Sequence, residues 1–278
     1  GFGVRLHVIE NAKCGLCSEN CAFCSQSSVS TAEIDRYPLE SPEAIFEAAR
    51  RAEALNAVRV CIVTSAREPS DEEIDRMCAT VRRIKAEIDI DVCNSLGFLT
   101  PDKAAKLKAA GVDRYNHNLE TSERFYPTIC RTHAYADRLA TARIAKDAGL
   151  ELCCGGLFGM GETNEDRVDL ADAIRDLNAD SVPLNFLDPR TGTPLEGLRR
   201  LEPLECLRIL AAYRLMLPDT ELRAAGGREA CLRSLQPLAL YAANSIFTSG
   251  YLTTDGQGEA RDRAMIEEAG FHIDAIEA

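Results

Sequence analysis

Residues 58–95, "VRVCIVTSAREPSDEEIDRMCATVRRIKAEIDIDVCNS", contain the pattern that predicts the fold. Residues 58–65 and 90–95 are short runs rich in β-branched and apolar residues, as in buried strands. Between them, residues 70–88 carry apolar side chains at helical spacing and begin with Ser before an acidic residue, as a capped helix does. Strand, helix and strand in this order predict parallel strands joined by a helical crossover.

The same alternation continues along most of the chain. Further strand-like runs lie at residues 113–119, 150–159, 181–187, 220–226 and 244–247, and further helical patterns at residues 41–56, 101–111, 135–149, 164–179 and 203–216. With 278 residues and no dinucleotide-binding fingerprint, we expect an α/β fold of the (β/α)8 TIM-barrel type, and a doubly wound open sheet is the alternative. We expect a single domain over residues 1–278, with an N-terminal segment and cysteine-rich loop in residues 1–35 and the barrel and C-terminal region in residues 36–278.

Composition limits the classes of function. The net charge of −12 argues against nucleic acid and anionic membranes as partners, because binding to phosphates needs clustered Lys and Arg. No run of 18 apolar residues is present, so we expect no membrane-spanning helix. The first residues, "GFGVRLHVIE", show no secretory leader and no initial Met, so we expect a cytoplasmic protein with a missing N-terminal segment. Twelve cysteines in a chain of this size favour metal or redox chemistry over a disulfide scaffold.

Strand parity predicts which side chains enter the barrel. In a parallel barrel, the apolar face of each strand packs against the helices and the alternate residues fill the interior. Val58, Val60 and Ile62 therefore face outward, and the opposite faces of this strand and the later ones direct Cys, Asn and Arg inward. Barrel enzymes place their active sites at the carboxyl ends of the strands. The inward residues predicted near those ends are Cys61, Cys93, Asn116, Asn118, Cys153, Asn185 and Arg223.

A cysteine-rich segment, "KCGLCSENCAFCSQ", occupies residues 13–26. Cys17, Cys21 and Cys24 have the spacing C-x3-C-x2-C, and thiolates are natural ligands of iron–sulfur clusters and zinc. Three cysteines on a four-iron cluster would leave one iron open for catalysis. Cys14 as a fourth ligand would instead give a closed zinc site or an ordinary ferredoxin-like site, so the spacing leaves both interpretations open.

The same cysteine spacing, with Phe23 before the last cysteine, resembles the radical S-adenosylmethionine (SAM) superfamily. Longer motifs resemble the biotin synthase family, in family order along nearly the whole chain: "CAFCSQSS", "CNSLG", "YNHNLETS", "HAYADRL", "GGLFGMGET", "GTPL", "AGGRE" and "AANSIF". The resemblance implies a homodimeric (β/α)8 barrel enzyme, a radical SAM sulfurtransferase that inserts sulfur into dethiobiotin to form biotin.

Two iron–sulfur clusters are implied by this resemblance. Cys17, Cys21 and Cys24 would hold a 4Fe-4S cluster that binds SAM and cleaves it to methionine and a deoxyadenosyl radical, with one electron from reduced flavodoxin or ferredoxin. The radical would take hydrogen from dethiobiotin, and the resulting carbon radical would attack a sulfide of an auxiliary cluster, 2Fe-2S or larger. The implied ligands of that auxiliary cluster are Cys61, Cys93, Cys153 and Arg223.

Other residues match family positions that contact the substrate or SAM. Asn116, Asn118 and Asn185 would hydrogen-bond the ureido group of dethiobiotin, since their amides supply both donors and acceptors. Glu120 matches a position at the ribose of SAM where family members often have Asp, and the Arg138 guanidinium suits the SAM carboxylate. The residues implied to bind SAM are Phe23, Glu120, Arg138, Gly156 and Leu157.

Several cysteines and histidines have no such role. Cys154 stands where many family members carry Ser, and parity directs it toward the helices; with Cys14, it leaves the type of the auxiliary cluster open. Cys130 is expected to pack rather than to bind a metal. Cys78, Cys206 and Cys231 are expected to be inert core residues, and His7, His117, His133 and His272 show no metal-like spacing. The alternative functions are a related radical SAM enzyme, such as a hydrogenase maturase, and a non-catalytic iron–sulfur electron carrier.

Overall fold

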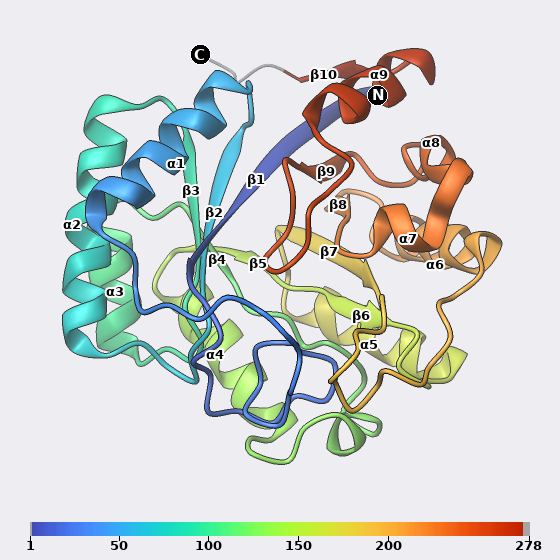
Figure 1. Cartoon of the computed structure of the whole chain (residues 1–278), viewed down its shortest axis with the longest axis horizontal. Helices are drawn as coiled ribbons and strands as arrows, with labels where there is room; N and C mark the ends of the chain where they lie inside the picture. The colour runs from blue at the N-terminus through green and yellow to red at the C-terminus, as the bar shows by residue number, and fades with distance from the viewer. Residues whose placement is uncertain (1, 275–278) are drawn as a thin grey trace.

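The computed structural model describes residues 2–274 and contains a closed barrel of parallel strands (Figure 1). β9 pairs with β1, with Ser245 opposite Arg5, and this pairing closes the ring. The expected α/β TIM-type barrel is therefore confirmed, and the open-sheet alternative is wrong. In sheet order the ring consists of β1 (Gly3–Lys13), β2 (Arg59–Thr64), β3 (Asp91–Ser95), β4 (Arg114–Asn116), β5 (Glu151–Cys153), β7 (Ser181–Phe186), β8 (Glu221–Ala224) and β9 (Ser245–Thr248), while β6 (Gly156–Phe158) pairs with β7 and β10 (His272–Ile273) with β1.

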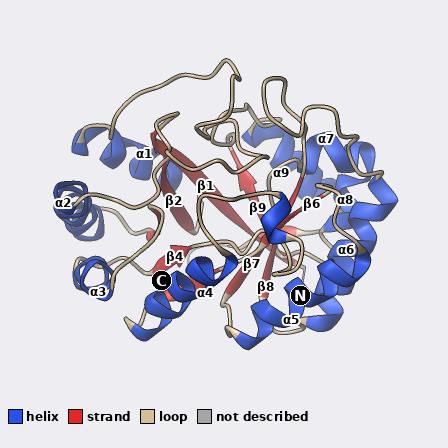
Figure 2. Ribbon diagram, turned by 90° about the horizontal axis from the view of Figure 1, so that it is seen from below, coloured by secondary structure: helices blue, strands red, loops and turns tan. Residues whose placement is uncertain are grey.

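Helices surround this ring on its outer side (Figure 2). Capping side chains fix where several of them begin: Ser70 Oγ accepts the Glu73 backbone N–H at 3.1 Å, and the Glu73 carboxylate accepts the Ser70 N–H at 3.0 Å. The helices are α1 (Pro42–Ala54), α2 (Asp71–Glu87), α3 (Pro101–Ala109), α4 (Tyr135–Asp147), α5 (Asn164–Asp176), α6 (Pro203–Met216), α7 (Arg228–Leu232), α8 (Gln236–Ala239) and α9 (Glu259–Glu268), with 3-10 turns η1 (Tyr126–Thr128) and η2 (Arg233–Leu235).

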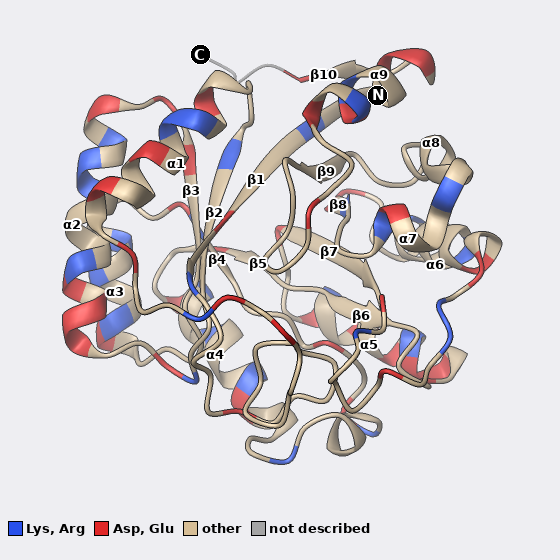
Figure 3. Cartoon of the chain, in the orientation of Figure 1, with Lys and Arg blue, Asp and Glu red and all other residues tan. Residues whose placement is uncertain are grey.

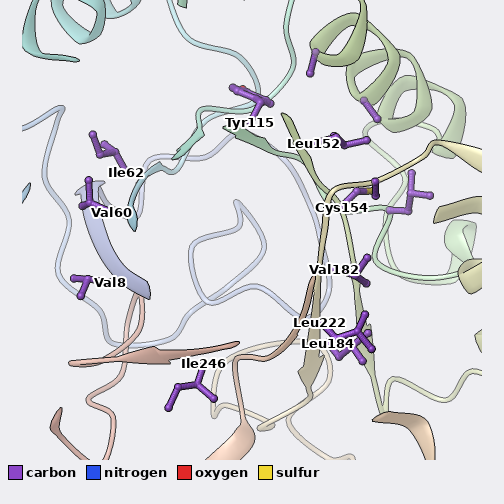
Figure 4. Close-up of a cluster of buried hydrophobic side chains, with 14 of the residues drawn as sticks. Val8, Val60, Ile62, Tyr115, Leu152, Cys154, Val182, Leu184, Leu222 and Ile246 are labelled. Carbon is purple, nitrogen blue, oxygen red and sulfur yellow. The ribbon is translucent and has the colours of Figure 1, made fainter. Parts of the chain in front are cut away.

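The hydrophobic core lies between the strands and the helices (Figure 4). Val60 and Ile62 on β2 and Val182 and Leu184 on β7 are fully buried there, as strand parity predicted. Burial of each such side chain contributes roughly 1.5–3 kcal/mol, so the outer face of the ring supplies much of the folding free energy. Polar side chains lie in the interior of the barrel.

Charged residues close the amino end of the barrel. The first residues of β2, β3, β4, β5 and β8 are joined in one network. Arg59 Nη2 donates to Asp91 Oδ2 at 2.6 Å, Arg114 Nε donates to Glu151 Oε2 at 2.8 Å, and Arg114 Nη1 reaches Glu221 at 3.3 Å. Arg59, Arg114 and Glu221 are all buried, so these ion pairs form a floor beneath the interior.

The barrel begins earlier in the chain than the sequence predicted. β1 lies within residues 1–35, which were assigned to an N-terminal segment rather than to the barrel. Its buried Val4, Leu6 and Val8 alternate with Arg5 and His7, and polar residues return after Ile9 in the sequence "ENAK", so the run lacks the compact apolar character of the other strands. The short elements β10 and α7–α9 were also not predicted, because each is too brief or too polar to show a clear period.

The outer surface carries charges of both signs. Lys and Arg alternate with Asp and Glu along α1 and α2 (Figure 3), and several form ion pairs such as Arg83 with Glu43 at 2.6 Å. Within residues 2–274, no helix is long and apolar enough to cross a membrane.

Candidate active site

A cavity of about 300 Å³ opens at the carboxyl ends of the strands, the end that faces the viewer in Figure 2. Cys17, Cys21 and Cys24, here called the loop thiols, line it from the segment after β1. Cys61, Cys93 and Cys153, here called the strand thiols, line it from β2, β3 and β5. The other predicted site residues on its wall are Phe23, Asn116, Asn118, Glu120, Arg138, Asn185 and Arg223.

The loop that carries the loop thiols is held by hydrogen bonds rather than by regular structure. The Gly15 N–H donates to Gln26 Oε1 at 3.0 Å, the Leu16 N–H to Ser65 Oγ at 3.2 Å, and the Ala22 N–H to the Ile129 carbonyl at 2.8 Å. Burial raises the pKa of Cys17, and it raises that of Cys24 to about 11. These thiols would therefore be protonated at neutral pH unless a cation binds them, and three thiols on the wall of one cavity fit a metal cluster.

Cys21 has neighbours that the sequence did not predict. Its Sγ lies 3.8 Å from Cys130 Sγ, and Cys130 Sγ lies 3.4 Å from His133 Nδ1. His133 Nδ1 also contacts the Glu19 carboxylate, while His133 Nε2 is 2.7 Å from the Tyr126 hydroxyl. The donor atoms of Cys21, Cys130 and His133 all lie within 4.8 Å of one another. Cys130 is thus not simply a packing residue, because η1 and the loop after it bring it and His133 to the loop thiols.

The strand thiols lie in a charged pocket inside the barrel. The hydrogen bond from Cys93, helped by His7 and Arg223, holds the pKa of Cys61 well below its ordinary value. Cys153 Sγ is 3.2 Å from Asn116 Nδ2 and 3.8 Å from Arg223 Nη1. The same hydrogen bond raises the pKa of Cys93 well above its ordinary value, so the proton of this pair of thiols stays on Cys93.

Two buried nitrogens beside the strand thiols have no hydrogen-bond partner among the described residues. They are His7 Nδ1 and Arg223 Nε, and both side chains are at most 1% exposed. Orphaned buried donors are costly, so a group with acceptor atoms is expected to fill this space. Sulfide and thiolate sulfurs of an iron–sulfur cluster are such acceptors, and the set of three thiols with Arg223 therefore fits the implied auxiliary cluster.

The side-chain amides of the three predicted asparagines already form some hydrogen bonds within the protein. Asn116 Nδ2 donates to Asn118 Oδ1 at 3.2 Å, and Asn118 Oδ1 also accepts the Gly155 N–H at 3.1 Å. Asn185 joins two strand ends, since its Nδ2 donates to the Gly156 carbonyl at 3.0 Å and its Oδ1 accepts the Gly226 N–H at 2.9 Å. Asn116 and Asn118 both line the cavity, so the parts of their amides that are not used in these bonds are open to a ligand.

Glu120 and Arg138 form a buried pair at the cavity wall. Their charged groups are 3.8 Å apart, and Arg138 Nη1 donates to the Asn118 carbonyl at 2.8 Å. Burial raises the pKa of Glu120, although Arg138 and the Asn118 amide partly offset this effect. Glu120 has a φ of +71°, an unusual conformation for a residue with a side chain and one often found at functional sites. Gly156 does not line the cavity: it pairs with Glu120, whose carbonyl would lie 2.8 Å from any Cβ at residue 156.

Leu157 lines an adjoining cavity of about 370 Å³ rather than the first one. Phe23, Cys24 and Glu120 line both cavities, so the two spaces share a wall. The predicted SAM-binding residues other than Gly156 are therefore spread over both spaces, and Gly156 lines neither.

The remaining cysteines lie outside the two thiol sets. Cys14 forms a backbone bridge with Tyr37 and lines a different cavity, so its position does not favour a fourth ligand beside the loop thiols. Cys154 is fully buried among Leu152 and other outward-facing side chains (Figure 4), as parity predicted. The other buried cysteines in the helical layer are Cys78, Cys206 and Cys231.

Comparison with known proteins agrees with this arrangement. Residues 14–174 match the radical SAM superfamily, and residues 183–272 match the biotin and thiamin synthesis associated domain. A biotin synthase from Salinibacter ruber is 51% identical over all of this chain and 77% of its own length. The chain belongs to the biotin synthase family. A second biotin synthase, from Bacillus subtilis, is 49% identical over all of this chain and 83% of its own length.

Solved structures share the biotin synthase fold at much lower identity. Methylornithine synthase superimposes with a TM-score of 0.85 at 22% identity, over 99% of this chain and 85% of that one. An FeFe-hydrogenase maturase from Carboxydothermus hydrogenoformans gives a TM-score of 0.85 at 19% identity, over 100% of this chain and 69% of that one. These likenesses show a common barrel and nothing about the substrate.

Proposed function

We propose that the chain forms biotin from dethiobiotin by inserting sulfur through radical SAM chemistry. The observation that carries the proposal is one cavity lined by both thiol sets and by three asparagines. An electron carrier needs clusters but no substrate groups, whereas this cavity joins the thiols to amides and to a Glu–Arg pair. Family membership points in the same direction.

Two resident clusters would supply the chemistry. When bound, a 4Fe-4S cluster would provide the electron that cleaves SAM, and an auxiliary cluster would provide the sulfur. The loop thiols would hold the first, and the strand thiols with Arg223 the second. Arg138 would pair with the SAM carboxylate, and Glu120 would accept from the ribose hydroxyls. Phe23, on the wall between the two cavities, and Leu157, in the adjoining cavity, would pack beside SAM.

The remaining amide atoms of the asparagines suit a cyclic urea. A ureido group offers two N–H donors and one carbonyl acceptor, so its site needs acceptors for the first and a donor for the second. Asn116 Oδ1 can accept a ureido N–H, because only the Nδ2 of that amide bonds to the described residues. Asn118 Nδ2 carries two hydrogens, so it can donate to the ureido carbonyl even when one of them is directed to Glu120. Asn185 would add its remaining amide hydrogen from the facing strand.

Partners and location follow from the proposed reaction. SAM cleavage requires a one-electron donor, so reduced flavodoxin or ferredoxin would dock near the loop thiols. A homodimer and a cytoplasmic location are part of the same proposal.

The test is an anaerobic assay of reconstituted protein with SAM, a reductant and dethiobiotin, read by mass spectrometry. We expect both biotin and deoxyadenosine. Cys61→Ala should abolish biotin and keep deoxyadenosine, because Cys61 belongs to the strand thiols and SAM is cleaved at the loop thiols. Cys78→Ala, the same substitution in α2 away from the cavity, is the matched control and should keep both products.

Other outcomes would change the assignment. Deoxyadenosine without biotin in the wild type would keep radical chemistry and overturn the substrate. Neither product from protein shown to contain its clusters would favour an electron carrier.

A further inference from the structure

His7 is a fully buried histidine inside the barrel to which the proposed reaction gives no role. It lies on β1, its side chain is 0% exposed, and its ring meets Phe247 edge-on at 6.2 Å. His7 Nε2 is 3.2 Å from Arg223 Nη2 and 3.3 Å from Glu221 Oε1. A buried imidazole so close to the implied guanidinium ligand needs an explanation beyond packing.

The contact with Arg223 decides where the imidazole carries its hydrogen. A guanidinium has only donors, so Arg223 Nη2 can bond His7 Nε2 only if Nε2 offers a lone pair. The neutral ring then carries its hydrogen on Nδ1. The opposite tautomer would direct an Nε2–H toward Glu221 Oε1, 3.3 Å away, but that oxygen already accepts hydrogen bonds from Arg223, Ser181 and Ser245.

The Nδ1 atom has no partner in the protein part of the site. It is buried and lacks a hydrogen bond among residues 2–274, and its strand pairs with β2 so that His7 lies opposite Arg59 and Ile9, on the same face, opposite Cys61. An N–H in this position is therefore available to a sulfur atom held by the strand thiols.

We propose that His7 is a positioning residue of the auxiliary cluster, which holds Arg223 through Nε2 and donates its Nδ1–H to a cluster sulfur beside Cys61. This inference rests on the proposed function, because it requires the auxiliary cluster. Hydrogen bonds to cluster sulfurs stabilise the added negative charge of the reduced cluster and so raise its reduction potential. His7 would thus have two effects: it would hold Arg223 in place and raise the reduction potential of the cluster.

The test measures that potential directly. In a Cys17→Ala, Cys21→Ala, Cys24→Ala background, which removes the loop thiols, only the auxiliary cluster contributes to a potentiometric titration followed by absorbance and electron paramagnetic resonance. His7→Phe keeps an aromatic ring against Phe247 and removes both nitrogens. We expect the ratio of reduced to oxidised cluster at a fixed potential to fall about tenfold, which is about 59 mV for one electron.

Two further variants make the result specific. His7→Asn retains a donor on a shorter side chain and should recover part of the lost potential, which a purely steric role would not predict. His272→Phe, the same substitution at an exposed histidine, should leave the potential unchanged. An unchanged potential in His7→Phe, with a full complement of iron and sulfide, would overturn the inference and leave the proposed function intact.

A second measurement covers the case in which His7→Phe does not retain its cluster. Wild-type protein labelled with 15N-histidine should show a weakly coupled histidine nitrogen in pulsed electron paramagnetic resonance of the reduced auxiliary cluster. A strongly coupled nitrogen would make His7 a direct ligand, and no coupling would remove it from the site, so either result overturns the inference. Wild-type protein that binds only one cluster would overturn the proposed function as well.

Discussion

The side-chain amide of Asn116 contacts two neighbouring residues in the cavity. Its Nδ2 lies 3.2 Å from both Cys153 Sγ and Asn118 Oδ1, so its hydrogens are directed to the protein while Oδ1 remains free for a ligand. The same side chain can therefore orient a strand thiol and accept a hydrogen bond from the substrate. Loss of this amide should affect the coupling between SAM cleavage and product formation more than the cleavage itself.

Asn116→Ala tests that division of roles. We expect the KM for dethiobiotin to rise about five- to thirtyfold, because a hydrogen bond of about 1–2 kcal/mol is lost. The ratio of deoxyadenosine to biotin should also rise, since cleavage at the loop thiols no longer leads efficiently to product. Asn164→Ala, at the exposed start of α5, is the control, and equal ratios in the two variants would contradict the assignment.

Glu10 on β1 gives a pH-dependent prediction away from the thiols. Burial, and then the hydrogen bond and charge of Glu40, raise the pKa of Glu10 from 4.5 to about 7. The folded state therefore binds this proton more tightly than the unfolded state. The contribution of Glu10 to stability is fully present below pH 4.5 and is lost as the pH rises through about 7.

Glu10→Gln should thus raise the free energy of unfolding at pH 8 by about 1–2 kcal/mol, after allowance for solvent screening of a partly exposed group. At pH 5 the variant and the wild type should have nearly equal melting temperatures. Anaerobic thermal unfolding at both pH values measures the difference, and Glu40→Gln should reproduce its pH dependence. A gain of the same size at both pH values would show that the charge of Glu10 is not the cause.

The junction of β5 and β6 shows how a break in one strand shapes the site. After Cys153 the chain continues through Cys154 and Gly155 before β6 pairs with β7. A Cβ at Gly155 would lie 1.9 Å from the Pro183 carbonyl oxygen, so only glycine allows β7 to approach this closely. The Gly155 N–H in turn holds the Asn118 side chain, which links the break to the proposed substrate site.

Gly155→Ala should therefore destabilise the protein by about 3 kcal/mol, the upper end of the usual cost of overpacking. We expect a clear fall in melting temperature together with weaker binding of dethiobiotin. Gly197→Ala is the matched control, because a Cβ at that residue would have no described atom within 4 Å and its φ is not positive. Equal melting temperatures for the two variants would mean that β7 can move away without cost.

The alternation of side chains along the strands predicted most of the cavity residues that the strands contribute. Because parallel strands share one direction, the alternation in "VRVCIV" alone was enough to direct Cys61 into the barrel and Val60 toward the helices. Cys130 and His133 could not be found this way. They come from an irregular loop, and only tertiary contacts with Glu19 and Tyr126 bring them to Cys21.

Across the whole molecule, the barrel gathers residues from distant parts of the chain at one end. Cys17 and Arg223 are separated by most of the sequence, yet both line the same cavity. The fold class and the cavity residues of the strands followed from alternation, length and motif. The contact of His7 with Arg223 and that of the Asn116 amide with Cys153 did not, because they are hydrogen bonds between strands that the sequence does not specify.

The ion-pair floor has a kinetic consequence. Arg59, Arg114 and Glu221 block the amino end of the barrel, so molecules reach the strand thiols from the loop side. Under the proposed function, dethiobiotin would bind beside the strand thiols and SAM beside the loop thiols, so the two molecules would share one entrance, and dethiobiotin, bound deeper, would enter first and leave last. The sulfur that replenishes the auxiliary cluster after turnover would have to enter by the same route, so it could not reach the cluster until the product has left.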